Sequence, residues 1–296
     1  MDPSQQTYEA FFGFVERPFS LTPDPKYYFR GRSHSRAFDA LSAGISRRES
    51  LLLITGDLGV GKTTLCRTLV ALLERKTRAA LVGNALLSPE DLLRLLLQDL
   101  GAIAKDDVRG RLVGATRTEL QQMLDQFLLR LRSSQDGAVL IIDEAHSLPS
   151  ATVEQIVQLA ALESNREKVL QILLAGQPAV AGGPALPRAL DERLATRVRL
   201  LPLERDECER YVHHRLTIAG GAGVTFSQRA SDVIYGLSGG VPRLVNLLAE
   251  RALQEGAVLG ARRIEPGMIE SAASALQLLR LRPKRFRWFG TQGSAR

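Results

Sequence analysis

The sequence predicts an α/β fold in which a mostly parallel sheet has helices on both faces, followed by a small helical domain. Strand-sized apolar runs alternate with helical patterns as far as Pro202, and this alternation is typical of parallel sheets. After Pro202 every pattern is helical, so no further strand is expected. A chain of 296 residues is long enough to bury the cores of both domains.

Apolar runs over 51–55, 79–82, 138–142, 170–175 and 197–201 are expected to be strands. Helices are expected over 34–45, 62–75, 88–100, 118–131 and 152–163, and then over 203–216, 227–237, 242–256 and 266–279. Ser88 is a favourable N-cap and Pro89 a favourable first helical residue. We therefore divide the chain into an N-terminal segment rich in aromatic residues and proline (1–33) packed on the core, an α/β domain (34–202), a helical lid (203–279) and a tail (280–296).

The composition is that of a soluble globular protein, with 45% hydrophobic and 24% charged residues. No apolar run approaches the roughly 18 residues that a membrane span needs, and the first residues do not resemble a signal peptide. Two cysteines and four histidines form no metal-binding pattern, so a reducing cytoplasm is expected. The net charge of +7 permits anionic partners without identifying one.

A glycine-rich loop follows the first predicted strand and precedes a helix. Its residues are Gly56, Asp57, Leu58, Gly59, Val60, Gly61, Lys62 and Thr63, and Thr64 comes next in the helix. This is the P-loop pattern, in which backbone N–H groups and a helix N-terminus surround phosphates, so we expect all nine residues to bind ATP. Lys62 would neutralise phosphate charge, and the Thr63 hydroxyl would bind Mg²⁺. A chance glycine loop is the alternative, and the flanking elements disfavour it.

An acidic pair, Asp143 and Glu144, ends the third predicted strand about eighty residues later. Asp143 would hold Mg²⁺ through its water shell, and Glu144 would orient or deprotonate the attacking water. Such a pair is often only a helix cap, but after a P-loop it indicates nucleotide hydrolysis.

Together, these motifs and the helical lid resemble the AAA+ ATPases, a resemblance that implies the sheet order 5-1-4-3-2. It assigns Gln177, after the fourth strand, as the sensor of the γ-phosphate, a position where the family more often has Asn, Thr or Ser. Asn84, after the second strand, matches the glutamate-switch residue, although it could simply form a turn. Arg243, after Pro242, matches the sensor 2 arginine of the lid.

The resemblance also implies an arginine finger before the fifth strand, which would reach into the site of a neighbouring subunit. Arg197 is the first candidate and Arg193 the second, and either could instead be a surface charge. Self-association into a ring or filament follows from this assignment.

The chain resembles the ExeA/GspA-like ATPases, including MshM-type proteins of pilus biogenesis, more closely. The resemblance rests on residues 8–14 (YEAFFGF), 17–25 (RPFSLTPDP), 170–178 (LQILLAGQP) and 240–248 (GVPRLVNLL). It implies an oligomeric ATPase that assists a secretion or pilus machine. Full-length ExeA-like proteins continue into a membrane span and a peptidoglycan-binding domain, whereas this sequence stops at Arg296. It is therefore a naturally short form or a chain cut before the span.

Two other functions remain open. Transposition regulators of the TnsC/TniB type share the ATPase core and bind DNA, and a pure ATP-binding switch would hydrolyse ATP poorly. The tail carries Arg280, Arg282, Lys284, Arg285 and Arg287 among Phe286, Trp288 and Phe289. This mixture suits peripheral contact with the inner face of the cytoplasmic membrane, and it would also suit nucleic acid or be a disordered end.

Overall fold

The computed structural model describes residues 7–74, 76–103, 112, 114–164, 167–168, 170–178, 188–221 and 223–277. The chain forms two compact units. The α/β unit comprises Leu21–Leu203 together with Val241–Arg243. The helical unit contains the described residues of 7–20, 204–240 and 244–277.

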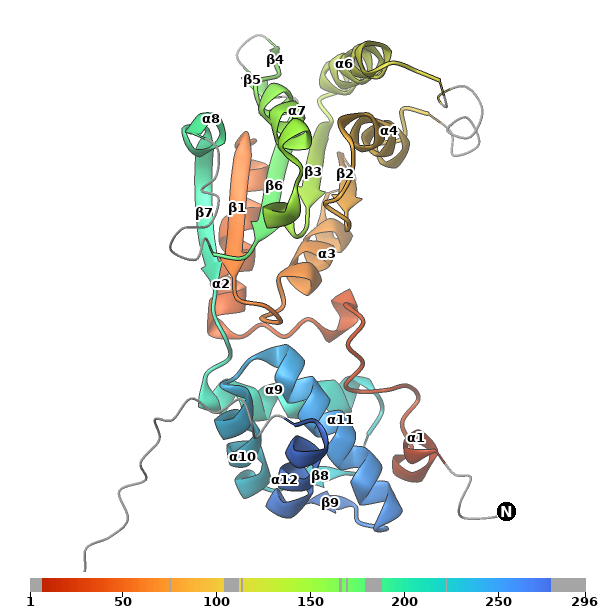
Figure 1. Ribbon diagram of the computed structural model, residues 1–296, viewed down its shortest axis with the longest axis vertical. Coiled ribbons are helices and arrows are strands. Elements are labelled where there is room, and N and C mark those ends of the chain that lie inside the picture. The colour runs from red at the N-terminus through yellow and green to blue at the C-terminus, as the bar shows by residue number, and fades with distance from the viewer. Residues whose placement is uncertain are drawn as a thin grey trace, which may run out of the picture. The chain divides into compact units, whose positions relative to one another are not determined.

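The sheet of the α/β unit has five strands, all in parallel pairs (Figure 1). They are β1 (Leu51–Gly56), β2 (Thr77–Val82), β3 (Gly137–Ile142), β6 (Leu170–Gly176) and β7 (Leu194–Leu200). Their order across the sheet is β2-β3-β6-β1-β7. Counted along the chain this is 5-1-4-3-2, so the predicted fold class and strand order are confirmed.

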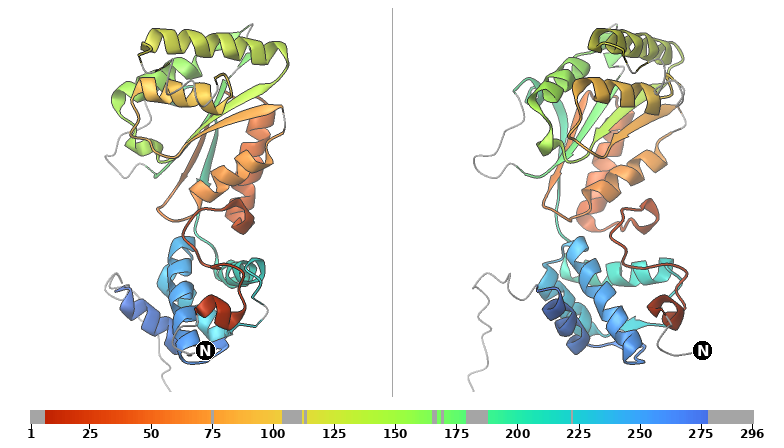
Figure 2. Two further views of the ribbon diagram at one scale, coloured as in Figure 1. Left: turned by 90° about the vertical axis from the view of Figure 1, so that its right-hand side faces the viewer. Right: turned by 45° about the vertical axis from the view of Figure 1, so that its right-hand side comes forward.

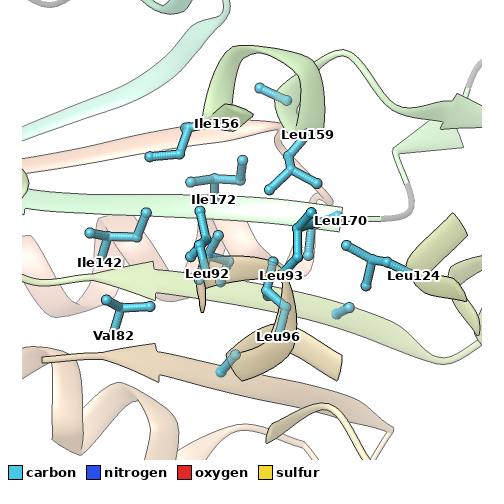
Figure 3. Close-up of a cluster of buried hydrophobic side chains, with 14 of the residues drawn as sticks. Val82, Leu92, Leu93, Leu96, Leu124, Ile142, Ile156, Leu159, Leu170 and Ile172 are labelled. Carbon is cyan, nitrogen blue, oxygen red and sulfur yellow. The ribbon is translucent and has the colours of Figure 1, made fainter. Parts of the chain in front are cut away.

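Helices cover both faces of this sheet (Figure 2). On one face, α2 (Arg32–Ser46) and α3 (Lys62–Leu72) pack against Leu52 and Ile54. On the other, α4 (Pro89–Asp99), α6 (Arg117–Ser133) and α7 (Ser150–Ala160) pack against Leu51 and Leu53. Successive residues of a strand point to opposite faces, so one apolar run supplies two cores. Figure 3 shows the core on the face covered by α4, α6 and α7. All the side chains drawn there are aliphatic.

Local sequence signals set several of these boundaries. The hydroxyl of Ser88 accepts the backbone N–H of Asp91, and Pro89 begins α4. Thr116 and Glu119 form a reciprocal capping box at the start of α6. The prediction misplaced the start of β7 by three residues, because alternate residues of this edge strand are exposed and Arg197 interrupts the apolar pattern. The sequence also did not predict the pair β4 (Glu163–Ser164) and β5 (Glu167–Lys168) or helix α8 (Arg188–Asp191).

The helical unit contains α9 (Arg205–Ile218), α10 (Gln228–Ser238), α12 (Pro266–Ala275) and most of α11 (Pro242–Val258). The expectation that no strand follows Pro202 is wrong. β8 (Thr225–Phe226) and β9 (Arg263–Ile264) form a short parallel pair in this unit. Two residues are too few for strand periodicity to be visible in a sequence.

The N-terminal segment, predicted as one piece over 1–33, divides at Ser20 between the two units. Its first part contains α1 (Tyr8–Phe12) and packs in the helical unit, where Phe12 and Phe19 are buried. The Phe19 ring meets Phe226 edge-on with 6.2 Å between centroids. Arg215 donates to the carbonyl oxygens of Pro18 and Ser20. Aromatic burial and charged hydrogen bonds thus fix this segment.

A half-buried carboxylate also anchors α1 to the helical unit. The Tyr8 hydroxyl donates to Oε1 of Glu250 at 2.7 Å. Burial raises the pKa of Glu250, although the bond from Tyr8 acts in the opposite direction. A raised pKa means that the folded state holds this proton more tightly than the unfolded chain does. The contribution of Glu250 to stability therefore falls as pH rises through the raised pKa.

Replacing Tyr8 with Phe removes the hydrogen-bond donor that offsets the cost of burying the Glu250 carboxylate. We expect the free energy of unfolding to fall by about 1–3 kcal/mol at pH 8, and by less at pH 5, where a larger fraction of Glu250 is protonated and the donor matters less. Tyr211→Phe is the matched control, because the Tyr211 hydroxyl donates to the neutral amide of Asn246 at 2.9 Å in the same unit. Thermal unfolding of both variants at the two pH values measures the difference. An equal loss for Tyr8→Phe at both would show that ionisation of Glu250 does not contribute.

Candidate functional site

The loop between β1 and α3 can be built only with glycine at its turning points. Gly59 and Gly61 have φ values of 81° and 104°, in the left-handed region that side chains disfavour. Gly56 is required for space, since a Cβ there would lie 2.7 Å from the carbonyl oxygen of Leu200. These constraints give the loop the curved backbone of a P-loop, at the N-terminus of α3.

Lys62 lies inside the loop and is buried. Its Nζ donates to the carbonyl oxygens of Gly56 at 2.9 Å and Asp57 at 3.1 Å. The ammonium group is thus held at the centre of the loop, where it can meet phosphate oxygens as a point charge. Of the other predicted loop residues, Leu58 is exposed, Val60 is fully buried, and the Thr64 carbonyl accepts the hydroxyl of Thr68.

The hydroxyl of Thr63 donates to Oδ2 of Asp143. Asp143 is buried, and its Oδ1 accepts the backbone N–H of Glu144 at 2.9 Å. The two residues predicted to hold Mg²⁺ thus lie together, although eighty positions separate them. A hydroxyl and a carboxylate are the hard oxygen ligands that Mg²⁺ prefers, so the pair fits this ion. Bound there, the ion would neutralise charge on phosphate oxygens.

Glu144 begins a tight turn, η3 (Ala145–Ser147), with a left-handed backbone (φ 53°, ψ 36°). In this turn Nδ1 of His146 lies 3.4 Å from Oε2 of Glu144. Nε2 of the same ring lies 3.3 Å from Nε2 of Gln177, the predicted sensor. The structure therefore brings Glu144 and Gln177 to the same histidine. We did not predict His146 from the sequence, because a single histidine leaves no spacing pattern.

His34 is a second residue that we did not predict. It is buried at the start of α2, and its Nε2 lies 2.9 Å from the carbonyl oxygen of Val60 in the loop. A carbonyl oxygen only accepts, so Nε2 carries the proton. A Cβ on Gly61 would lie 3.4 Å from the same nitrogen. His34 thus supports the loop through a hydrogen bond to its backbone.

Asn84 and Arg243 are the two remaining candidates for sensing the nucleotide. The side-chain oxygen of Asn84 accepts the backbone N–H of Leu86 at 3.0 Å, as in a turn-forming asparagine, so its glutamate-switch role stays a prediction. In the α/β unit, the backbone N–H of Arg243 donates to the carbonyl oxygen of Gly59 at 3.2 Å. The sensor role of its guanidinium also stays a prediction.

The two arginine-finger candidates lie at β7. Arg197 is exposed on this edge strand and pairs with Asp191 at 2.5 Å. Arg193 lies just before the strand, where its carbonyl oxygen accepts the hydroxyl of Ser50 at 3.3 Å. The predicted tail contact at 280–289 lies outside the described residues. Within those residues, no helix is both long and apolar enough to cross a membrane.

Comparison with known proteins agrees with this fold. Residues 45–182 match the family described as AAA domain. General secretion pathway protein A of Aeromonas hydrophila is 34% identical over 268 residues, which are 90% of this chain and 48% of that protein. The chain thus spans about half the length of this curated relative.

Solved structures are similar in fold at low identity. The ORC2 protein of Aeropyrum pernix has a TM-score of 0.65 at 17% identity, covering 88% of this chain and 72% of that one. Cdc6p from Pyrobaculum aerophilum has a TM-score of 0.70 at 16%, covering 88% and 71%. The RuvB branch migration motor of Thermotoga maritima has a TM-score of 0.56 at 21%, covering 90% and 73%. The protein has the P-loop AAA+ fold and resembles the ExeA/GspA-like ATPases, as its sequence predicts.

The position of Lys62 predicts its contribution to nucleotide binding. Replacing Lys62 with Ala should weaken ATP binding about 10- to 100-fold, because charged hydrogen bonds to the phosphates are lost. Lys76→Ala, which removes a lysine before β2 and outside the loop, is the control. Calorimetric titration with ATP and Mg²⁺ measures both affinities. A parental affinity in the Lys62→Ala chain would exclude Lys62 from the site.

Proposed function

We propose that this protein binds ATP with Mg²⁺ and hydrolyses it. The observation that supports this most strongly is the cluster at the carboxyl ends of β1 and β3. Lys62 is positioned for the phosphates, Thr63 and Asp143 for the metal, and Glu144 for the attacking water. Lys62 and Asp143 are buried, which strengthens their electrostatic effect on phosphate charge.

We further propose that the hydrolysing form is an oligomer in which one chain completes the site of the next. In the register of the sheet, Leu51 pairs with Leu194 and Gly56 pairs with Leu200. Arg193 therefore lies beside the start of β1, and the loop lies at its end. Arg193 and the loop are therefore six residues apart along the strand direction. At about 3.3 Å per residue this is roughly 20 Å, which is more than an arginine side chain can span. Arg193 cannot serve its own nucleotide, and Arg197, in mid-strand, points to solvent from the edge of the sheet.

We propose that the ATP cycle assists a secretion or pilus assembly machine. The support is the relative named General secretion pathway protein A, which matches 90% of this chain. The match covers 48% of that relative, and only the matched part supports this proposal. Location at the inner face of the cytoplasmic membrane is part of this proposal. No comparison favours the DNA-binding transposition regulator.

Hydrolysis is tested most directly at Glu144. Glu144→Gln should bind ATP as the parent does, while turnover falls by about 10²- to 10⁴-fold, because an amide cannot accept the proton of water. Glu154→Gln, an exposed position on α7, is the matched control and should keep the parental rate. Steady-state phosphate release measures both. A rate within a few-fold of the parent would remove Glu144 from the chemistry.

A mixing experiment tests whether Arg197 acts on a neighbouring chain. Arg197→Ala should bind ATP and hydrolyse it slowly, and Lys62→Ala should bind it only weakly and hydrolyse little of it. Mixing the two should restore part of the activity, because some interfaces then combine an intact loop with an intact arginine. Light scattering confirms assembly in each mixture. Absence of rescue at every ratio would leave Arg197 as a surface residue, and Arg193→Ala would be tested in the same way.

A further inference from the structure

The turn after β3 brings a histidine back to the proposed general base. Glu144 has a left-handed backbone, and its carbonyl oxygen accepts the backbone N–H of Ser147 at 2.9 Å. Such a conformation is strained in a residue other than glycine, and it persists where surrounding structure requires it. Here its result is that the His146 ring lies beside the Glu144 carboxylate, 3.4 Å from Nδ1 to Oε2. Both side chains are partly accessible, at 34% and 39% exposed, so a nucleotide or water can reach them.

The other edge of the same ring faces the end of β6. Nε2 of His146 lies 3.3 Å from the amide nitrogen of Gln177. Gly176 precedes Gln177 and has no side chain between the strand and the ring. A Cβ at Gly176 would lie 3.6–3.9 Å from His146 atoms. His146 therefore bridges the ends of two neighbouring strands, β3 and β6.

The chemistry of the two neighbours selects one tautomer of the neutral ring. An ionised carboxylate only accepts hydrogen bonds, and an amide nitrogen only donates them. A neutral imidazole with its proton on Nδ1 satisfies both, because Nδ1 then donates toward Glu144 and Nε2 accepts from Gln177. Contacts of 3.3–3.4 Å are long for hydrogen bonds, as is common in sites without substrate, where they tighten on binding.

The family resemblance assigns the glutamate-switch role to Asn84, but the side chain of Asn84 makes another contact. The Asn84 side chain accepts the backbone N–H of Leu86, within its own loop. We propose that His146 is a positioning residue that joins Glu144 to Gln177, so that the general base and the γ-phosphate sensor are restrained as one unit. This assignment rests on the proposed ATPase function. When the Gln177 amide turns to a phosphate, the restraint on the imidazole changes, and the change reaches Glu144 through the ring.

A double-mutant cycle measures this connection in the full chain. His146→Ala should lower kcat about 10- to 100-fold and leave KM for ATP nearly unchanged, as expected when an orienting partner is lost. His146→Gln, which keeps a donor and an acceptor, should recover part of kcat. The combined loss in His146→Ala with Gln177→Ala should be at least fivefold smaller than the product of the single losses. The control pair, His146→Ala with Glu154→Gln at the exposed position on α7, should show simple multiplication. Multiplicative losses for the first pair, or a parental kcat in His146→Ala, would overturn the proposal.

Nitrogen NMR of the imidazoles tests the proposal without requiring hydrolysis. In the ATP-free chain we expect His146 as the Nδ1–H tautomer and His34, which faces the Val60 carbonyl, as the Nε2–H tautomer. Glu144→Gln and Gln177→Ala should each shift the His146 resonances and leave those of His213, an exposed histidine of the helical unit, unchanged. An Nε2–H tautomer at His146, or indifference to both substitutions, would overturn the bridge. A chain that hydrolyses no ATP would refute the proposed function, and the tautomer would still decide the role of His146.

Discussion

The contact between the Thr63 hydroxyl and the Asp143 carboxylate is the constraint on which the site depends. It joins the first turn of α3 to the end of β3, so the loop and the acidic pair cannot be displaced independently. Lys62 and Thr63 are neighbours at the start of α3, and Glu144 follows Asp143. One hydrogen bond between a helix and a strand therefore connects the four predicted site residues. β6 lies between β3 and β1 in the sheet, and its end carries Gln177 at the same edge.

The sequence predicts the interior of this fold well, because burial on both faces leaves continuous apolar runs such as 138–142, and caps such as Ser88 mark helix starts. It predicts the periphery poorly. β7 is an edge strand whose exposed residues include Arg197, so its first half does not read as a buried strand. β8 and β9 contain two residues each, and their pairing joins positions 225 and 263, which no local pattern connects.

The sequence likewise predicts one part of the candidate site well and another part poorly. The P-loop and the acidic pair are local motifs, and the structure brings them together as expected. His34 and His146 were missed because their contacts are with the distant residues Val60 and Gln177. A set of histidines that binds a metal is marked by its spacing in the sequence. A single histidine that supports a loop or bridges two strand ends leaves no spacing pattern, so it becomes visible only when the sheet is assembled.

The motif that most resembles the ExeA/GspA-like proteins lies outside the catalytic cluster, and its contacts explain its composition. Phe12 and Phe19 are buried in the helical unit, which binds this part of the chain through Arg215. Further along, in the α/β unit, the Tyr28 hydroxyl donates to the carbonyl oxygen of His34 at 2.8 Å. His34 in turn contacts the loop at Val60. The aromatic residues thus complete the core of one unit and support the P-loop of the other. The composition of this segment therefore follows from packing requirements in both units.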